Sequence, residues 1–304
     1  MSAWKRISYL AFAGLAFAQV GAAPGPIMPA ATPASFADHQ AQCAGKDGWS
    51  DAAPPIRIFG NVYDVGSCGI VVVLIAGPKG HIVIDAATAE AAPGVIANIQ
   101  RLGFRLADVK VLLSSHEHFD HAAGLAQLQQ QTGARMMAVA ASKPSLGSGI
   151  ASTSDPQASE LPPFKGPRVD HVLKDGEIVA VGPLRLTAHA TPGHAPGSTS
   201  WSWTSTDNGV SHSIVYADSV TAIALGKYRF SDHPDYVAVF KTSLGKIAHL
   251  PCDLLITPHP AVSNFYARLA GAAPLSDPAA CMNYAATGRR KLDERLAAEA
   301  AGRN

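Results

Sequence analysis

The residues best suited to chemistry form one hexapeptide, His116-Glu117-His118-Phe119-Asp120-His121. Four of its side chains, those of His116, His118, Asp120 and His121, are common metal ligands at a spacing that suits two ions. Imidazole nitrogens and carboxylate oxygens bind Zn²⁺ at about 2.0–2.2 Å. The segment follows the apolar run 109–113, expected to be a buried strand, and precedes residues with helical spacing. The hexapeptide therefore predicts a metal site on a strand-to-helix turn.

Two more histidines have the same context. His194 follows the strand-like segment 184–188, and His259 follows the strand-like segment 253–256. Both lie on turns that contain proline or glycine, which hold the backbone in a defined direction. Either one alone would more often be an ordinary loop residue, but with the hexapeptide they complete three ligands for each of two ions. The remaining histidines are expected to be ordinary surface or core residues: His39, His81, His171, His189, His212, His233 and His249.

The order HxHxDH, then TPGH, then a late histidine at a strand end resembles the metallo-β-lactamase superfamily. Longer segments resemble subclass B3 of the class B β-lactamases, namely NVYDVG (61–66), TPGHAPGSTSW (191–201), YADS (216–219) and PCDLLITPHP (251–260). The resemblance extends from about Phe36 to the C-terminal helix. It implies an α/β protein with the αβ/βα four-layer sandwich, as a single metallo-β-lactamase domain over 36–304.

The expected cofactor is a pair of zinc ions in each chain. The first would be bound by His116, His118 and His194, and the second by Asp120, His121 and His259. A water between the two ions would lose its proton near neutral pH, since one zinc already lowers the pKa of water to about 7. The hydroxide would attack a carbonyl carbon, with Asp120 as both ligand and catalytic orienting group. The expected function is an exported dizinc β-lactamase that opens the ring of penicillins, cephalosporins and carbapenems.

Four other residues have expected roles near the metals. Asp85 ends a strand where this superfamily often has a carboxylate that supports a ligating histidine, although a simple turn cap would look the same. Ser219 and Thr221 match positions where the resembled subclass binds the substrate carboxylate. Asp218 matches a region where glyoxalase II-like members have a metal-bridging aspartate. Because YADS fits the β-lactamase pattern better, Asp218 is left out of the ligand set.

Two other functions remain open. One is a different hydrolase of the superfamily, such as a glyoxalase II-like thioesterase or a lactonase. Export counts against the thioesterase, because glutathione thioesters are cytosolic. The other is a zinc-binding protein without activity, but three protein ligands for each ion leave an open position for chemistry.

The N-terminus predicts export to the periplasm. Lys5 and Arg6 precede a mostly apolar stretch over 7–20, and small residues up to Ala22 form a cleavage site. Residues 1–22 are therefore read as a signal peptide and residues 23–35 as a flexible leader. A membrane anchor is the rival interpretation, but the apolar stretch is shorter than the roughly 20 residues that span a bilayer.

The four cysteines also suit an oxidising compartment. Four cysteines allow three pairings. The resemblance implies Cys252–Cys281, which leaves Cys43 with Cys68, although both pairs could instead be reduced and buried. A net charge of +1 gives no indication of nucleic-acid binding. The expected partner is a small β-lactam, and the chain is expected to be a monomer without a stable membrane anchor.

Alternating apolar and turn-forming segments predict the secondary structure. Strands are expected at 56–59, 62–65, 70–76, 81–85, 109–114, 135–140, 171–173, 177–181, 184–189, 200–204, 213–217 and 254–257. Helices are expected at 93–102, 121–132, 236–248 and 281–299. Ligands at strand ends agree with the general position of sites in α/β proteins.

Overall fold

The computed structural model describes residue 1 and residues 33–303. The predicted signal peptide and most of the predicted leader therefore lie outside the described residues. The folded part begins with helix α1 (Phe36–Cys43), which Ser35 caps by accepting a hydrogen bond from the Asp38 amide at 3.1 Å. The Asp38 side chain accepts in turn from the Ser35 amide, so the two residues form a capping box.

The described residues contain two β-sheets. The first has the strand order β1-β2-β3-β4-β5-β6-β7 and the second has the order β12-β11-β10-β9-β8. The first comprises β1 (Ile56–Phe59), β2 (Val62–Asp64), β3 (Val73–Ile75), β4 (His81–Ile84), β5 (Val109–Leu113), β6 (Arg135–Val139) and β7 (Val169–Leu173). The second comprises β8 (Ile178–Val181), β9 (Leu184–Ala190), β10 (Thr199–Asp207), β11 (Val210–Tyr216) and β12 (Leu254–Ile256). All twelve predicted strands are present, with ends that differ by a few residues.

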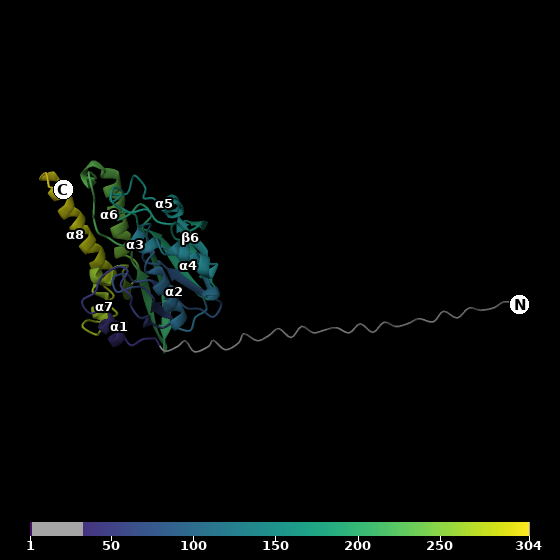
Figure 1. Cartoon of the computed structure of the whole chain (residues 1–304). Coiled ribbons are helices and arrows are strands. Elements are labelled where there is room, and N and C mark those ends of the chain that lie inside the picture. The colour runs from purple at the N-terminus through teal and green to yellow at the C-terminus, as the bar shows by residue number, and fades with distance from the viewer. Residues whose placement is uncertain (2–32, 304) are drawn as a thin grey trace.

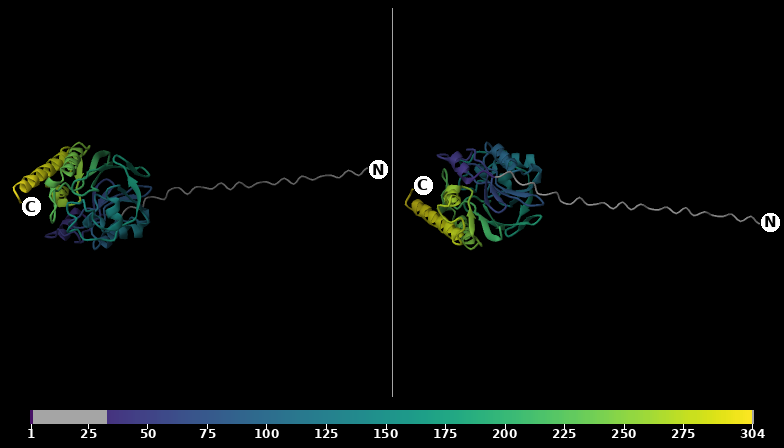
Figure 2. Two further views of the ribbon diagram at one scale, coloured as in Figure 1. Left: turned by 90° about the horizontal axis from the view of Figure 1, so that it is seen from above. Right: turned by 90° about the horizontal axis from the view of Figure 1, so that it is seen from below.

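The sheets pack face to face, and helices cover both outer faces. The central core joins apolar residues of both sheets, such as Ile82 and Leu113 from the first and Trp201 and Ile214 from the second. Helices α2 (Ala92–Arg101) and α4 (Leu125–Thr132) cover the first sheet, and α6 (Pro234–Ala248) and α8 (Ala280–Ala300) cover the second. Figures 1 and 2 show these helix pairs on opposite sides of the molecule. The αβ/βα sandwich is confirmed.

The helix predicted at 121–132 is wrong in one respect, because it is two helices. Helix α3 (Phe119–Ala122) ends before Gly124, and α4 begins after it. A β-carbon on Gly124 would lie 2.2 Å from the carbonyl oxygen of Ala86, so the chain at this point approaches the loop after β4 too closely for any side chain. This contact holds the end of the hexapeptide 116–121 against the segment that carries Asp85.

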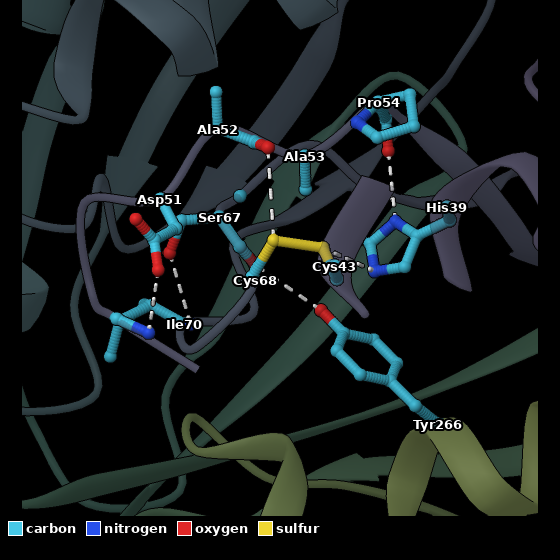
Figure 3. The surroundings of a disulfide bond; sticks show 12 residues. His39, Cys43, Asp51, Ala52, Ala53, Pro54, Ser67, Cys68, Ile70 and Tyr266 are labelled. Atoms are coloured by element: carbon cyan, nitrogen blue, oxygen red, sulfur yellow. Dashed lines mark hydrogen bonds between the residues drawn. A yellow bond between two sulfur atoms is a disulfide. The ribbon is translucent and has the colours of Figure 1, made fainter. Parts of the chain in front are cut away.

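Both expected disulfide pairs are formed. Cys43–Cys68 joins the end of α1 to the loop after β2, and Cys252–Cys281 joins the segment before β12 to the start of α8. Figure 3 shows the first bond beside the rings of His39 and Tyr266. The ring of His39 is buried, with Nδ1 3.0 Å from the carbonyl oxygen of Pro54.

Three short helices were not predicted: α1, α5 (Lys143–Ser148) and α7 (Phe265–Leu269). In the part of the chain that the structure describes, no helix is both long enough and apolar enough to span a membrane.

Candidate active site

The predicted site residues follow the ends of strands that point to one edge of the sandwich. In the first sheet, β4 and β5 are parallel and end together, with Ile84 opposite Leu113, so Asp85 and the hexapeptide emerge side by side. In the second sheet, β11 and β12 are parallel and end together, with Tyr216 opposite Ile256. Strand β9 runs in the same direction, because it is antiparallel to β10, as β11 is. His194, Asp218 and His259 therefore reach the same edge.

His116, His118 and His194 form one cluster. Their ligand nitrogens lie within 4.8 Å of one another, and all three residues are buried. The ring centroids are 4.5 Å apart for His116–His118 and 4.9 Å apart for His116–His194. Burial, with the neighbouring histidines, holds the pKa of His116 and of His194 well below the usual range, so both rings are neutral at pH 7. Neutral imidazole is the form that binds metal.

Each ring in this cluster uses one nitrogen for an oxygen partner. His116 donates from Nδ1 to Asp218 Oδ1 at 2.8 Å, and His194 donates from Nδ1 to the Thr221 carbonyl oxygen at 3.1 Å. Nε2 of His118 lies 2.8 Å from Asp155 Oδ2. The nitrogens that face the cluster are therefore Nε2 of His116, Nδ1 of His118 and Nε2 of His194. Partners of this kind orient ligating histidines in metal sites.

Asp120, His121 and His259 form the second cluster. Asp120 Oδ2 lies 3.1 Å from His121 Nε2 and 3.3 Å from His259 Nε2, and the two Nε2 atoms are 3.2 Å apart. His121 is buried, whereas the side chain of His259 is 23% exposed, so this cluster is open on the His259 side.

In the second cluster, Asp120 and His121 each stabilise the charged form of the other. Burial opposes ionisation of Asp120, but His121 and the hydrogen bonds from both histidines outweigh it and hold its pKa well below the usual range. Burial also opposes the charged form of His121, but Asp120 and Asp85 raise its pKa to about 10. The cluster therefore pairs an anionic carboxylate with a protonated His121 ring, which would release its proton when a metal binds.

Both clusters fit zinc. Ligand atoms at 2.0–2.2 Å from a tetrahedral ion are about 3.3–3.6 Å apart, close to the three distances of the second cluster. In the first cluster, Nε2 of His116 is buried and has no hydrogen-bond partner. Such an atom is costly unless something binds it. Asp120 and His121 also lie within 4.8 Å of the His116 ligand atom, so the two clusters adjoin.

Asp85 lies behind the second cluster. Its carboxylate accepts hydrogen bonds from the Ser115 amide at 2.6 Å, the Ser115 hydroxyl at 2.7 Å and the Tyr216 hydroxyl at 2.7 Å. Asp85 Oδ2 is also 3.5 Å from His121 Nδ1. It thus fixes the residue before His116 and lies close to a predicted ligand, while its supporting role stays a prediction. Its φ of 67° shows that it also forms the turn after β4.

Asp218 does not face the metal clusters. Its carboxylate contacts Nδ1 of His116, the nitrogen on the opposite side of the ring from the cluster. Its amide donates to the Ser200 hydroxyl at 3.1 Å, and its carbonyl oxygen accepts from the Tyr284 hydroxyl at 3.1 Å. This geometry agrees with leaving Asp218 out of the ligand set.

Of the two predicted substrate residues, Thr221 lies beside the first cluster. Thr221 contacts His194 twice, because its hydroxyl oxygen is also 2.9 Å from Nδ1. Ser219 is mostly buried. On the other side, a pocket of about 490 Å³ is lined by His259, Trp49 and Tyr266 among others. The rings of Trp49 and His259 have centroids 5.6 Å apart, so the predicted zinc ligand also forms part of an aromatic wall.

Three residues near the first cluster had no predicted role. Asp155, which orients His118, belongs to the loop between α5 and β7, which has no regular structure. Gln157 lies in the same loop, and its side-chain Nε2 is 3.4 Å from His194 Nε2. Nothing in the local sequence signals a contact with residues 37 positions away. Glu117 is buried, and burial raises the pKa of its carboxyl to about 7.

Comparisons with known proteins identify the family of this chain. Residues 65–259 match the family model of the metallo-β-lactamase superfamily. The crystal structure of the metallo-β-lactamase MIM-1 from Novosphingobium pentaromativorans superposes with a TM-score of 0.85. It is 47% identical, and the match covers 87% of this chain and 98% of that one. MEM-A1, a subclass B3 metallo-β-lactamase from a soil metagenome library, has a TM-score of 0.80 and 43% identity, covering 84% and 100% of the two chains.

A second group of relatives is more distant. The hydroxyacylglutathione hydrolase of Cereibacter sphaeroides is 31% identical over 167 residues, which cover 55% of this chain. The chain spans about half the length of that enzyme, and 31% of the corresponding enzyme of Methylobacterium nodulans. The family model and the near-complete structural matches therefore decide the assignment: the chain belongs to the metallo-β-lactamase superfamily and resembles its subclass B3 enzymes.

Proposed function

We propose that this protein is a dizinc β-lactamase that opens the ring of penicillins, cephalosporins and carbapenems. The observation that carries the proposal is the pair of adjoining three-residue clusters at one edge of the sandwich. Solved relatives at 43–47% identity, which match along almost their whole length, are metallo-β-lactamases. His116, His118 and His194 would hold one zinc ion, and Asp120, His121 and His259 the other.

Bound zinc supplies a deprotonated water near neutral pH and polarises a carbonyl oxygen. The protein residues do the positioning. Asp120, which belongs to the second cluster and adjoins the first, would orient the attacking water. Asp218 holds His116 in place, and Thr221 holds His194. The Ser219 and Thr221 hydroxyls would bind the substrate carboxylate beside the first cluster.

The alternative is a thioesterase of the glyoxalase II type. Its support is the set of hydroxyacylglutathione hydrolases that match about half of this chain. Against it stands the position of Asp218, which faces Nδ1 of His116 rather than the clusters.

We also propose that residues 1–22 are a signal peptide, residues 23–35 a flexible leader and residues 36–304 the catalytic domain, and that the mature enzyme is a periplasmic monomer. Two disulfides in the described residues support an oxidising compartment.

The function can be tested on purified mature protein with a chromogenic cephalosporin, before and after removal of metal by a chelator. We expect hydrolysis that the chelator abolishes and added zinc restores, with two zinc ions bound per chain. A glutathione thioester serves as the second substrate. Cleavage of the thioester without cleavage of the cephalosporin would contradict the proposal, and saturation at one zinc ion would contradict the dinuclear site.

A further inference from the structure

Glu117 lies between two predicted zinc ligands, but its side chain points to a different loop. Its Oε1 accepts a hydrogen bond from the amide of Gly197 at 2.9 Å, which connects residues 80 positions apart. The side chain is buried, with only 3% of the residue exposed. The contact therefore joins the loop of His116 and His118 to the loop of His194.

The carboxyl group of Glu117 fits against residue 197 only because that residue is a glycine. A β-carbon at this position would lie 2.4 Å from Glu117 Oε2 and 2.2 Å from the β-carbon of Ser142, distances that real side chains do not reach. The glycine backbone therefore packs directly on the carboxyl group. A second bond joins the same loops nearby, from the Thr199 amide to the Ser115 carbonyl oxygen at 2.6 Å. That bond uses only main-chain atoms, whereas Glu117 contributes a side-chain bond to Gly197 itself.

The loop that carries His194 is stiff enough to transmit a shift at Gly197. The Gly193 amide donates to the Ala195 carbonyl oxygen at 3.2 Å, and the Ala195 amide donates to the Ser198 hydroxyl at 3.1 Å. Pro192 and Pro196 restrict the backbone further. Because His194 lies within this braced turn, the position of Gly197 affects the position of the imidazole.

We propose that Glu117 is a positioning residue that holds the His194 loop against the His116–His118 loop and so sets the geometry of the first zinc site. It does not touch metal or substrate. The inference rests on the proposed ligand set. Residues that orient metal ligands typically contribute 10- to 100-fold to metal affinity, and this effect should be confined to the first site.

The test measures zinc affinity in single-site proteins, by competition with a chelator. His259→Ala leaves the first site, and His194→Ala leaves the second. In the His259→Ala background, Glu117→Leu should weaken zinc binding by about 10-fold or more, because it fills similar space without an acceptor for Gly197. Glu117→Gln, which keeps an acceptor oxygen, should stay within about threefold. In the His194→Ala background, both changes should leave the affinity nearly unchanged.

Two controls complete the design. Ser142→Ala keeps the β-carbon that faces Gly197 and removes only the hydroxyl that donates to the Val139 carbonyl oxygen at 3.1 Å, so first-site affinity should be kept. Gly197→Ala keeps Glu117 but forces the loops apart, and it should weaken the first site even if Glu117→Leu does not fold. Equal first-site affinity for Glu117→Leu and the parent would overturn the positioning role, as would equal weakening of both sites. A His259→Ala protein that binds no zinc would contradict the ligand set itself.

Discussion

Hydrogen bonds on the outer side of the rings decide which histidine nitrogens are left for metal. Asp218, Asp155 and Thr221 each take one nitrogen of a different ring in the first cluster. The types and spacing of most of the proposed ligands were visible in the sequence, because the hexapeptide concentrates them in one turn. The partner Asp155 and the contact of Glu117 with Gly197 were not, because each depends on a loop brought close only by the fold.

Asp120 and Asp218 have different positions, and substitutions should separate their roles. Asp120→Ala is expected to lower kcat by about 100-fold or more, because loss of an orienting group near the reacting atoms forfeits the positioning advantage. Asp218→Asn should cost less than about 10-fold, since the asparagine oxygen can still accept the His116 proton. Steady-state kinetics and zinc content measured on the same samples provide the comparison. Loss of both zinc ions in Asp218→Asn would show that Asp218 bridges the metals, as in glyoxalase II-like hydrolases.

At the scale of elements, apolar runs predicted the central strands well because β3, β4 and β12 are buried on both faces. Strand β4, for example, is buried at all four positions. The helices missed were short: α5 contains a proline and a glycine, and α7 has only five residues. The break between α3 and α4 was missed because it depends on a tertiary contact, in which the Gly124 amide donates to the Ala87 carbonyl oxygen at 3.1 Å. Ligands could thus be assigned to strand ends before the helices were known.

The first residue of β4 should make stability depend on pH. His81 is 7% exposed, and its Nδ1 accepts a hydrogen bond from the Gly77 amide at 3.2 Å. Burial lowers the pKa of His81, so the folded protein keeps this ring neutral where the unfolded chain takes up a proton. The free energy of unfolding should therefore fall as the pH drops below about 6.5, by at most about 1.4 kcal/mol per pH unit from this residue.

Denaturant unfolding of wild type and His81→Gln between pH 5 and 8 can isolate this effect. The variant should show a shallower loss of stability at acidic pH. His249→Gln, at an exposed position, is the matched control and should keep the wild-type slope. Identical slopes for wild type and His81→Gln would mean that His81 is protonated equally in both states.

At the scale of the whole molecule, the C-terminal helix supports the segment that follows β11. Tyr284 of α8 donates to the carbonyl oxygen of Asp218, and Gly288 packs against Val220. Near the end of the same helix, the Glu299 carboxylate accepts hydrogen bonds from the amides of Phe230 and Ser231. The Cys252–Cys281 bond fixes the start of this helix beside β12, the strand that leads to His259. One disulfide therefore connects α8, which supports this segment, to the strand that leads to His259.

Removing either disulfide should lower stability by a similar amount. The bonds enclose sequence separations of 25 residues for Cys43–Cys68 and 29 for Cys252–Cys281. Loop closure in the unfolded chain then predicts a loss of about 3.5 kcal/mol for either pair. The alanine double variants can be compared by denaturant unfolding with a chelator in excess, so that zinc binding does not contribute to the difference. Because the loops match in length, each pair is the control for the other. A much larger loss of unfolding free energy for Cys252→Ala/Cys281→Ala would show that this bond also stabilises the folded state through α8. No loss for either double variant would refute the loop-closure argument.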